Sequence, residues 1–168
     1  MKYLSKRIPL AILALATSAS FGSAQSTNRA HACDDAILEG DYAFTITGEI
    51  LGASAPAPVA GVAMTYFDGK GNLRQVDHVL HGGKQPPVDW RPGTGTYKID
   101  LVSEEMDTDT YCVGKATITP VSGPPLDLFI VVAKDGSEVR TVVNDMGPKG
   151  PPVAITSIGI RRRTKHFE

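Results

Sequence analysis

Hydrophobic and polar residues alternate along most of this chain. Between residues 40 and 50, Tyr42, Phe44 and Ile46 alternate with polar or small residues, which is the pattern of a strand with one buried face. Comparable runs, rich in Val, Ile, Thr, Tyr and Phe, follow at 59–67, 72–80, 94–102, 111–119, 126–134, 137–144 and 153–161. The sequence therefore predicts about eight strands.

Glycine and proline separate these runs. Residues 68–71 (Asp-Gly-Lys-Gly) and 134–137 (Lys-Asp-Gly-Ser) both predict hairpins, because glycine tolerates the positive φ of a tight turn. Longer connections are marked by 82–87, 122–125 and 147–152. Helical periodicity is confined to one turn at 34–38, with Asp34 or Asp35 as its N-cap.

Eight sequential strands with mostly short connections predict an all-β fold. We expect an up-and-down antiparallel barrel of about eight strands, since closure removes exposed sheet edges. A two-sheet β-sandwich is the alternative. The residues predicted to face inward, all on one parity of their strands, are Leu38, Tyr42, Phe44, Ile46, Phe67, Tyr97, Ile99, Leu101, Ala116 and Ile118. Thr45, Glu49, Lys98 and Lys115 are predicted to face water.

The first residues predict a secretory signal peptide. Lys2, Lys6 and Arg7 precede an apolar run at 8–16, and small residues follow it. The run is shorter than the roughly 20 residues that span a bilayer, so we expect no transmembrane segment and a secreted protein, periplasmic or extracellular. The expected organisation is a signal peptide at 1–24, a flexible leader at 25–35, a single barrel domain at 36–161 and a basic tail at 162–168.

Removal of the signal peptide changes both the charge balance and the interpretation of the cysteines. It leaves 14 basic and 18 acidic side chains, a net charge of −4, so nucleic acid is not an expected partner. Export favours a disulfide between Cys33 and Cys112, because an oxidising compartment lets distant thiols pair. The bridge would constrain the unfolded chain by up to about 4 kcal/mol. The alternative, a reactive thiol, needs a neighbouring base or cation, which neither cysteine has in the sequence.

The order of several short motifs resembles a known group of proteins. They are Cys33, LEGDYAF at 38–44, FDGKGNL at 67–73, GTY at 95–97, CVG at 112–114, DGSE at 135–138 and Arg161. This order resembles an uncharacterised family of small secreted bacterial proteins with the pattern C…LxGxYxF…FDGxGxL…GTY…CxG…GxE…R. The resemblance implies a secreted β-barrel, similar in shape to the allene oxide cyclase and dirigent class and to calycins, and it transfers no catalytic residue. The acidic insert at 103–109 and the arginine-rich end depart from the pattern.

Four groups of residues suggest chemistry, and each has a simpler structural interpretation. The insert at 103–109 could offer oxygen ligands to a hard cation, but it lacks the spacing of a calcium loop, which favours a solvated hairpin loop. On a strand His78 and His81 point to opposite faces, and so do Asp77 and His78, so no metal site is expected. Trp90 is expected to plug a barrel end rather than to stack on a ligand. The basic end is expected to be a solvated tail rather than a site for an anionic surface.

The sequence leaves three classes of function open. An eight-stranded barrel has room for one small ligand, so the leading hypothesis is a module that binds a small apolar molecule through Tyr42, Phe44, Phe67 and Tyr97. The second is a cyclase or isomerase, and the third is a structural or surface-interaction protein. An enzyme needs an ionisable group inside the barrel, for which Glu49 and Asp100 are the candidates although both are predicted to face outward. No cofactor signature, GxSxG elbow or phosphate loop is present in the sequence.

Overall fold

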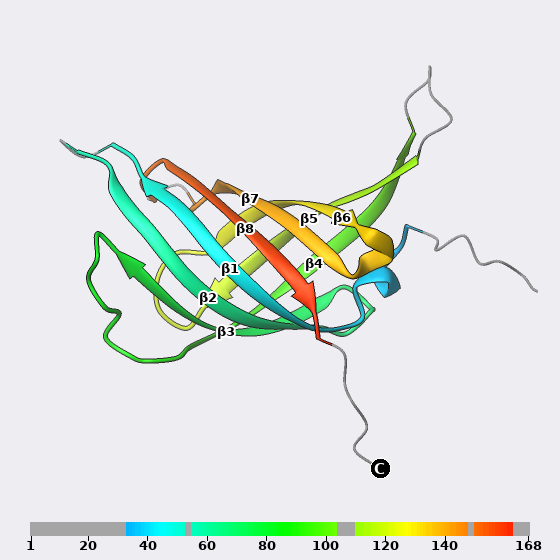
Figure 1. Cartoon of the computed structure of the whole chain (residues 1–168), viewed down its shortest axis with the longest axis horizontal. Coiled ribbons are helices and arrows are strands. Elements are labelled where there is room, and N and C mark those ends of the chain that lie inside the picture. Colours follow the sequence, from blue (N-terminus) through cyan, green and yellow to red (C-terminus); the bar gives the residue numbers. More distant parts are fainter. Residues whose placement is uncertain (1–32, 53–54, 104–109, 148–149, 163–168) are drawn as a thin grey trace, which may run out of the picture.

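In the computed structural model, which describes residues 33–52, 55–103, 110–147 and 150–162, the strands close into one antiparallel barrel (Figure 1). The strands are β1 (Gly40–Ile50), β2 (Ala57–Phe67), β3 (Asn72–His81), β4 (Arg91–Ser103), β5 (Thr110–Pro120), β6 (Leu126–Ala133), β7 (Glu138–Asp145) and β8 (Val153–Arg161). Each strand pairs with the next along the chain, and β8 pairs with β1 to close the ring. The predicted up-and-down barrel is confirmed, and the predicted strand bounds agree within three residues.

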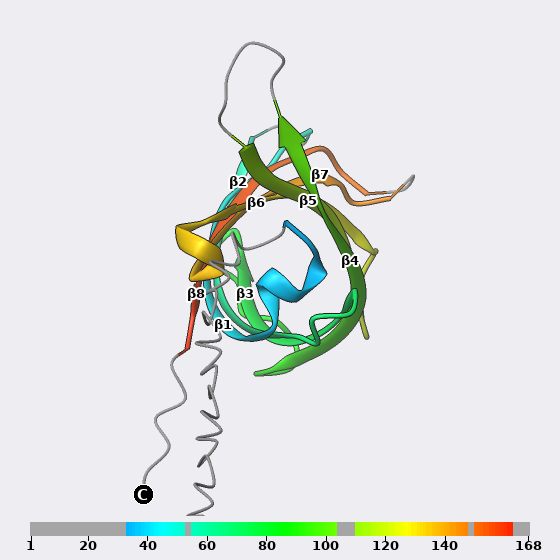
Figure 2. The same ribbon diagram turned by 90° about the vertical axis from the view of Figure 1, so that its right-hand side faces the viewer.

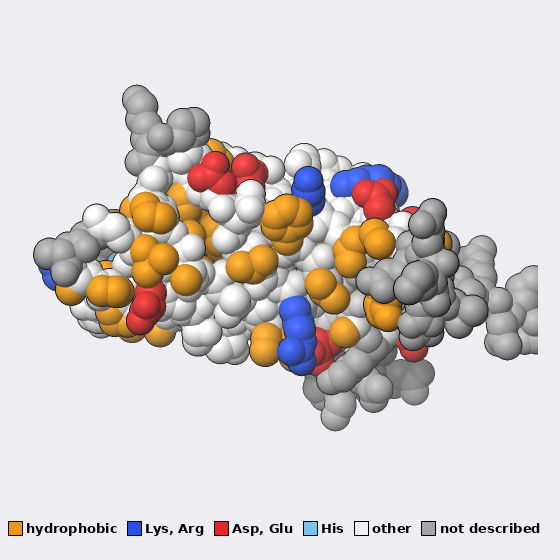
Figure 3. All heavy atoms as spheres, turned by 90° about the horizontal axis from the view of Figure 1, so that it is seen from above, with side chains coloured by type: hydrophobic (Ala, Val, Ile, Leu, Met, Phe, Trp, Pro, Cys, Tyr) orange, Lys and Arg blue, Asp and Glu red, His pale blue; other side chains and the backbone are white. Residues whose placement is uncertain are grey.

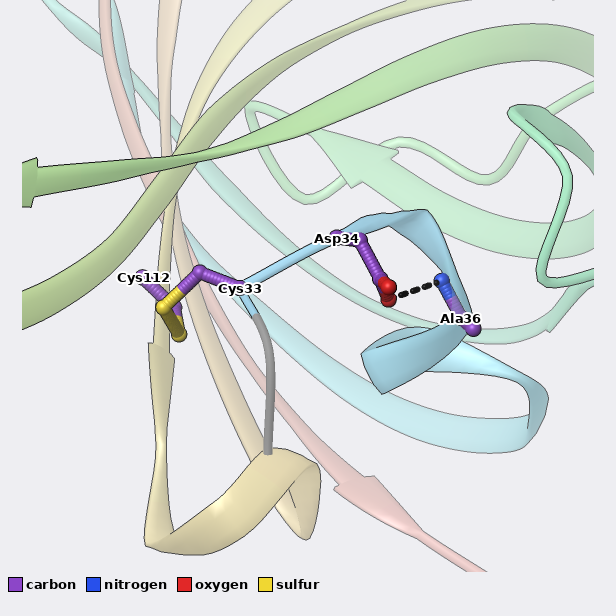
Figure 4. The surroundings of a disulfide bond; sticks show 4 residues. All are labelled: Cys33, Asp34, Ala36 and Cys112. Carbon is purple, nitrogen blue, oxygen red and sulfur yellow. Dashed lines mark hydrogen bonds between the residues drawn. A yellow bond between two sulfur atoms is a disulfide. The ribbon is translucent and has the colours of Figure 1, made fainter. Parts of the chain in front are cut away.

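A short 3-10 helix closes one end of the barrel. This helix, η1 (Asp35–Leu38), lies inside the ring of strands when the molecule is viewed along the barrel (Figure 2). The side chain of Asp34 caps it, since the Ala36 backbone N–H donates to Asp34 Oδ1 at 3.0 Å (Figure 4). The predicted helical turn and its N-cap are thus confirmed. We call this half of the barrel the plugged end, and the opposite half the open end.

Aromatic rings pack beneath the plug. The rings of Tyr42 and Phe67 meet edge to face with centroids 5.4 Å apart, and those of Phe67 and Tyr97 do the same at 5.0 Å. Leu38 of η1 and Tyr42 are fully buried against them. The phenol of Tyr42 donates to the Gly136 carbonyl, in the short helix η2 (Lys134–Gly136) between β6 and β7. This end of the barrel is therefore filled with side chains.

The plug is fastened to three strands. The predicted disulfide between Cys33 and Cys112 is present and joins the residues ahead of η1 to β5 (Figure 4). Asp35 Oδ1 accepts the Ile99 backbone N–H of β4 at 2.7 Å. Arg161 of β8 donates to the Ile37 carbonyl and, at 2.8 Å, to the phenol oxygen of Tyr42. Arg162 then donates its N–H to the Asp41 carbonyl, so both ends of the described chain lie at the plugged end.

The predicted core is correct with one exception. Inward-facing residues from Leu38 to Ile118 are buried or half-buried as expected, whereas Leu101 is 56% exposed. The reason is that β4 and β5 run on past the end of the barrel as a hairpin (Figure 1). β3 pairs with β4 only as far as Thr96, so among the described strands the part of β4 that carries Leu101 pairs with β5 alone. Thr45, Glu49, Lys98 and Lys115 are exposed, as predicted.

All ten prolines in the described part of the chain lie at the open end. They are Pro56, Pro58, Pro86, Pro87, Pro92, Pro120, Pro124, Pro125, Pro151 and Pro152, in the connections there or within two residues of a strand end. Because proline fixes φ, these connections have few alternative conformations. The described part of the open end therefore has a stiff rim.

Among the described residues no helix is long and apolar enough to cross a bilayer. The predicted signal peptide at 1–24, most of the leader and most of the basic tail lie outside the described residues. The tip of the acidic insert, at 104–109, also lies outside them.

Candidate functional site

The open half of the barrel contains a cavity of about 180 Å³. Its apolar walls come from six strands, through Ile46, Val59, Val79, Leu128, Val143 and Ile155. These residues are on the inward parity of their strands, on which hydrophobic side chains alternate with outward ones. The cavity is therefore the part of the barrel core that side chains leave unfilled.

A buried ion pair lies at the top of this cavity. Asp77 and Arg91 stand directly opposite each other as the last pair of the β3–β4 ladder. Arg91 Nε donates to Asp77 Oδ1 at 3.0 Å and Nη2 donates to Oδ2 at 3.1 Å, which is a two-pronged pairing of guanidinium and carboxylate. The Asp77 side chain is 4% exposed and that of Arg91 is 20% exposed. Charge inside the barrel is thus present and locally neutralised.

A chain of polar groups continues from Asp77 toward the plugged end. Gln75 Nε2 donates to Asp77 Oδ2 at 3.0 Å, and Thr65 Oγ1 donates to Gln75 Oε1 at 3.2 Å. Across the barrel the hydroxyl groups of Thr141 and Ser157 bond to each other at 2.7 Å. The oxygens and nitrogens of this interior network are paired, which agrees with the finding that no buried polar side-chain atom in the described residues lacks a partner.

A second void lies deeper in the barrel. It measures about 50 Å³, and Phe44, Phe67, Thr65 and Gln75 line it. Thr141, Ser157 and Leu128 line this void and the larger cavity alike. The two spaces therefore adjoin along the barrel, from the open end to the aromatic cluster under η1, and we refer to them together as the column.

The mouth of the column lies where β3 and β4 separate. After Asp77, β3 continues to His81 without a partner on β4, and residues 82–90 leave the barrel wall. A mouth pocket of about 230 Å³ results, lined by Asp77, Val79, His81, Lys84, Gln85, Pro86, Pro87, Val88, Arg91 and Ser122. Arg91 Nη1 donates to the Ser122 carbonyl at 3.3 Å and so connects β4 with the loop after β5. The ion pair lines both the mouth pocket and the cavity.

The four predicted ligand residues come together, but they lie mainly at the plugged end. Phe44 and Phe67 line the deeper void. Burial raises the pKa of Tyr42 although the neighbouring Arg161 opposes the shift, and burial raises the pKa of Tyr97 to about 12. Tyr97 donates its phenol proton to the Asp35 carbonyl at 2.9 Å. The Tyr97 hydroxyl thus bonds to the plug directly, and the Tyr42 hydroxyl bonds to Arg161, which in turn bonds to the plug. A ligand role for the four aromatic residues remains a prediction.

The carboxylate that lines the cavity is Asp77, which sequence reasoning did not assign to the interior. Glu49 and Asp100 are exposed, as expected, and line neither internal space. The sequence signal for its inward position was that Asp77 alternates in step with Leu73 and Val79 along β3. The signal was weak because Val76, which faces outward, is also apolar, so the two faces of β3 are hard to tell apart from the sequence.

Two further predictions concern the same end of the barrel. The prediction that His78 points to the opposite face of the strand from Asp77 and His81 is confirmed. Asp77 and His81 line the interior spaces, and His78 does not. The expectation that Trp90 plugs a barrel end is wrong, because Trp90 is 58% exposed and its ring lies 6.1 Å from that of His78. The stretch that carries Trp90 leaves the wall after β3, so its side chain lies outside the rim. In the described stretches of the chain, no three His, Cys, Asp or Glu side chains lie close enough together to hold a metal ion.

Comparison of the chain with protein-family models, curated proteins and solved structures finds no match. Membership of the group of small secreted bacterial barrels therefore stays a prediction. The closed barrel that this resemblance implies is present.

Proposed function

We propose that this protein binds a small apolar molecule in the column that starts at the open end of the barrel. The observation that carries the proposal is the combination of apolar walls contributed by six strands with a mouth pocket that adjoins the cavity at Asp77 and Arg91. Concave, mostly apolar spaces with a few convergent polar groups are typical of small-molecule sites. A stiff proline rim supports binding, because a mouth that is ordered before the ligand arrives loses little conformational freedom.

We also propose that the protein works outside the cytoplasm. The Cys33–Cys112 disulfide is typical of oxidising compartments, and the first 24 residues have the composition of a signal peptide. Whether the destination is the periplasm or the extracellular medium makes no difference to the chemistry of the cavity.

A cyclase or isomerase is the second candidate, and the interior position of Asp77 favours it. General acid–base catalysis needs a carboxylate within reach of the substrate. Asp77 meets the requirement of position, but its two oxygens already accept hydrogen bonds from Arg91 Nε, Arg91 Nη2 and Gln75 Nε2. A base that is paired in this way is poorly placed to take a proton from substrate, so binding ranks above catalysis.

Native mass spectrometry tests the binding proposal. The protein, purified with its disulfide from its own host, is expected to carry a small apolar metabolite that denaturation releases. A compound that is returned chemically changed would favour the isomerase instead.

A dye assay tests where the molecule binds. The neutral dye N-phenyl-1-naphthylamine is expected to fluoresce with the wild-type protein. Val143→Trp should abolish the signal, because Val143 lines the cavity. Val142→Trp is the matched control, since its neighbour Val142 is 43% exposed on the outer wall. No bound metabolite together with equal dye binding by both variants would contradict a ligand site inside the barrel.

A further inference from the structure

We propose, on the basis of the proposed function, that the ligand is an apolar acid. Its hydrocarbon or aromatic body fills the cavity, and its carboxylate, or an equivalent anionic oxygen group, stays at the mouth between Arg91 and Lys84. The proposal deepens the binding function by naming the chemical class of the ligand and its orientation.

The polar groups of the two adjoining spaces give the orientation. Most of the cavity wall is apolar, and Arg91 and His81 lie where the cavity meets the mouth pocket, since they line both. The mouth pocket adds Lys84 and the amide of Gln85 to its own apolar residues. Asp77 is the only carboxylate among the described residues that line the mouth. A ligand with an apolar body and one polar group fits these spaces when the body lies in the cavity and the polar group lies at the mouth. The polar group then keeps part of its hydration.

Arg91 has hydrogen-bond donors available at the mouth. A guanidinium has five N–H donors, and the structure uses three of them, two toward Asp77 and one toward the Ser122 carbonyl. One N–H on Nη1 and one on Nη2 therefore remain. A planar pair of N–H groups matches the two oxygens of a carboxylate, and charge assistance makes such bonds stronger than neutral ones.

Lys84 decides the sign of the charge that the mouth prefers. Asp77 neutralises Arg91, so the ion pair alone favours neither a cationic nor an anionic ligand. Lys84 has no ion-pair partner among the described residues, and it adds a positive charge to the same pocket. An amine would be repelled by Lys84, and a neutral alcohol would gain nothing from it.

Displacement of N-phenyl-1-naphthylamine from the full, disulfide-bonded protein by three ligands of equal chain length tests the proposal. The probes are decanoate, 1-decanol and decylamine. Decanoate is expected to bind about tenfold more tightly than 1-decanol, because one charge-assisted hydrogen bond accounts for about that difference in affinity. Decylamine is expected to bind most weakly. Raising the salt concentration should weaken decanoate binding and leave 1-decanol unchanged.

Two lysine variants localise the effect. Lys84→Gln should remove most of the preference for decanoate and leave the affinity for 1-decanol unchanged. Lys70→Gln is the matched control, because Lys70 is an exposed lysine in the turn between β2 and β3 at the plugged end. Equal affinities for decanoate and 1-decanol, or equal effects of the two substitutions, would overturn the acid proposal while dye binding upholds the cavity. Absence of dye and 1-decanol binding would instead overturn the binding function, and the acid proposal with it.

Discussion

Removal of Asp77 should reveal how much the interior ion pair matters to the fold. Asp77→Ala removes the two carboxylate oxygens that accept from Arg91. The Arg91 guanidinium then keeps only its hydrogen bond to the Ser122 carbonyl. Breaking a buried pair on one side costs about 3–5 kcal/mol, because a charge stays buried without compensation. Because the Arg91 side chain is 20% exposed, water relieves part of this penalty. We therefore expect a loss of about 3 kcal/mol in the free energy of unfolding.

Urea denaturation followed by far-ultraviolet circular dichroism measures this loss. The chain's single tryptophan is a poor probe of the core, because Trp90 is 58% exposed outside the rim. The slope of the unfolding free energy against urea should be the same in the variant and the wild type, which would show that only stability has changed.

A double variant separates charge from packing. Asp77→Leu combined with Arg91→Met replaces both charged groups with apolar ones of similar size. It should recover part of the stability that Asp77→Ala loses, although Gln75 Nε2 still lacks its acceptor. Lys98→Ala is the control for an exposed pair, since the Lys98 side chain is 63% exposed and its Nζ lies 3.4 Å from Asp35. It should cost less than about 1 kcal/mol. A cost below about 1 kcal/mol for Asp77→Ala, or a double variant less stable than the single one, would refute this reasoning.

Three more predictions follow from the plugged end and the strand contacts. Replacing Cys33 and Cys112 with serine should lower the free energy of unfolding by about 4 kcal/mol, because the bridge closes a loop between residues 79 apart; an unchanged urea midpoint would contradict it. The raised pKa of Tyr97, about 12 in the folded chain, means that the unfolded chain ionises first, so stability should be complete below about pH 10 and fall as pH rises toward 12. Urea midpoints across this range should fall less steeply for Tyr97→Phe than for the wild type. Gly159→Val should cost about 1–3 kcal/mol in thermal or urea unfolding, because a Cβ at this position overlaps the ring of Phe44; a fully stable variant would show that the ring moves aside without cost.

The barrel could be predicted because its signals are local. Alternation in Tyr42, Phe44 and Ile46 defines a strand and its inward face, and the turn glycines at 68–71 define where the chain reverses. Antiparallel order then follows from short connections. The error at Leu101 shows the limit of this reasoning, since alternation continues along β4 after the barrel that it faces has ended.

The cavity could not be predicted in the same way. Whether inward side chains fill a barrel depends on the sum of their volumes across eight strands, and no single strand carries that information. Asp77 and Arg91 lie 14 residues apart, on either side of a long connection, and only the register of β3 against β4 places them opposite each other. A polar residue on the inward parity of a strand is the feature to examine in similar sequences.

Both ends of the described chain leave the barrel beside η1, on the side opposite the mouth. Cys33 is held to β5 by the disulfide, and Arg162 bonds to β1 through Asp41. A fluorescent reporter, an affinity tag or a solid support joined through either end would therefore stand behind the closed base of the barrel. Immobilised molecules would all present the mouth pocket to the surrounding solution, so a ligand that binds as proposed would reach the cavity without any change to the open end.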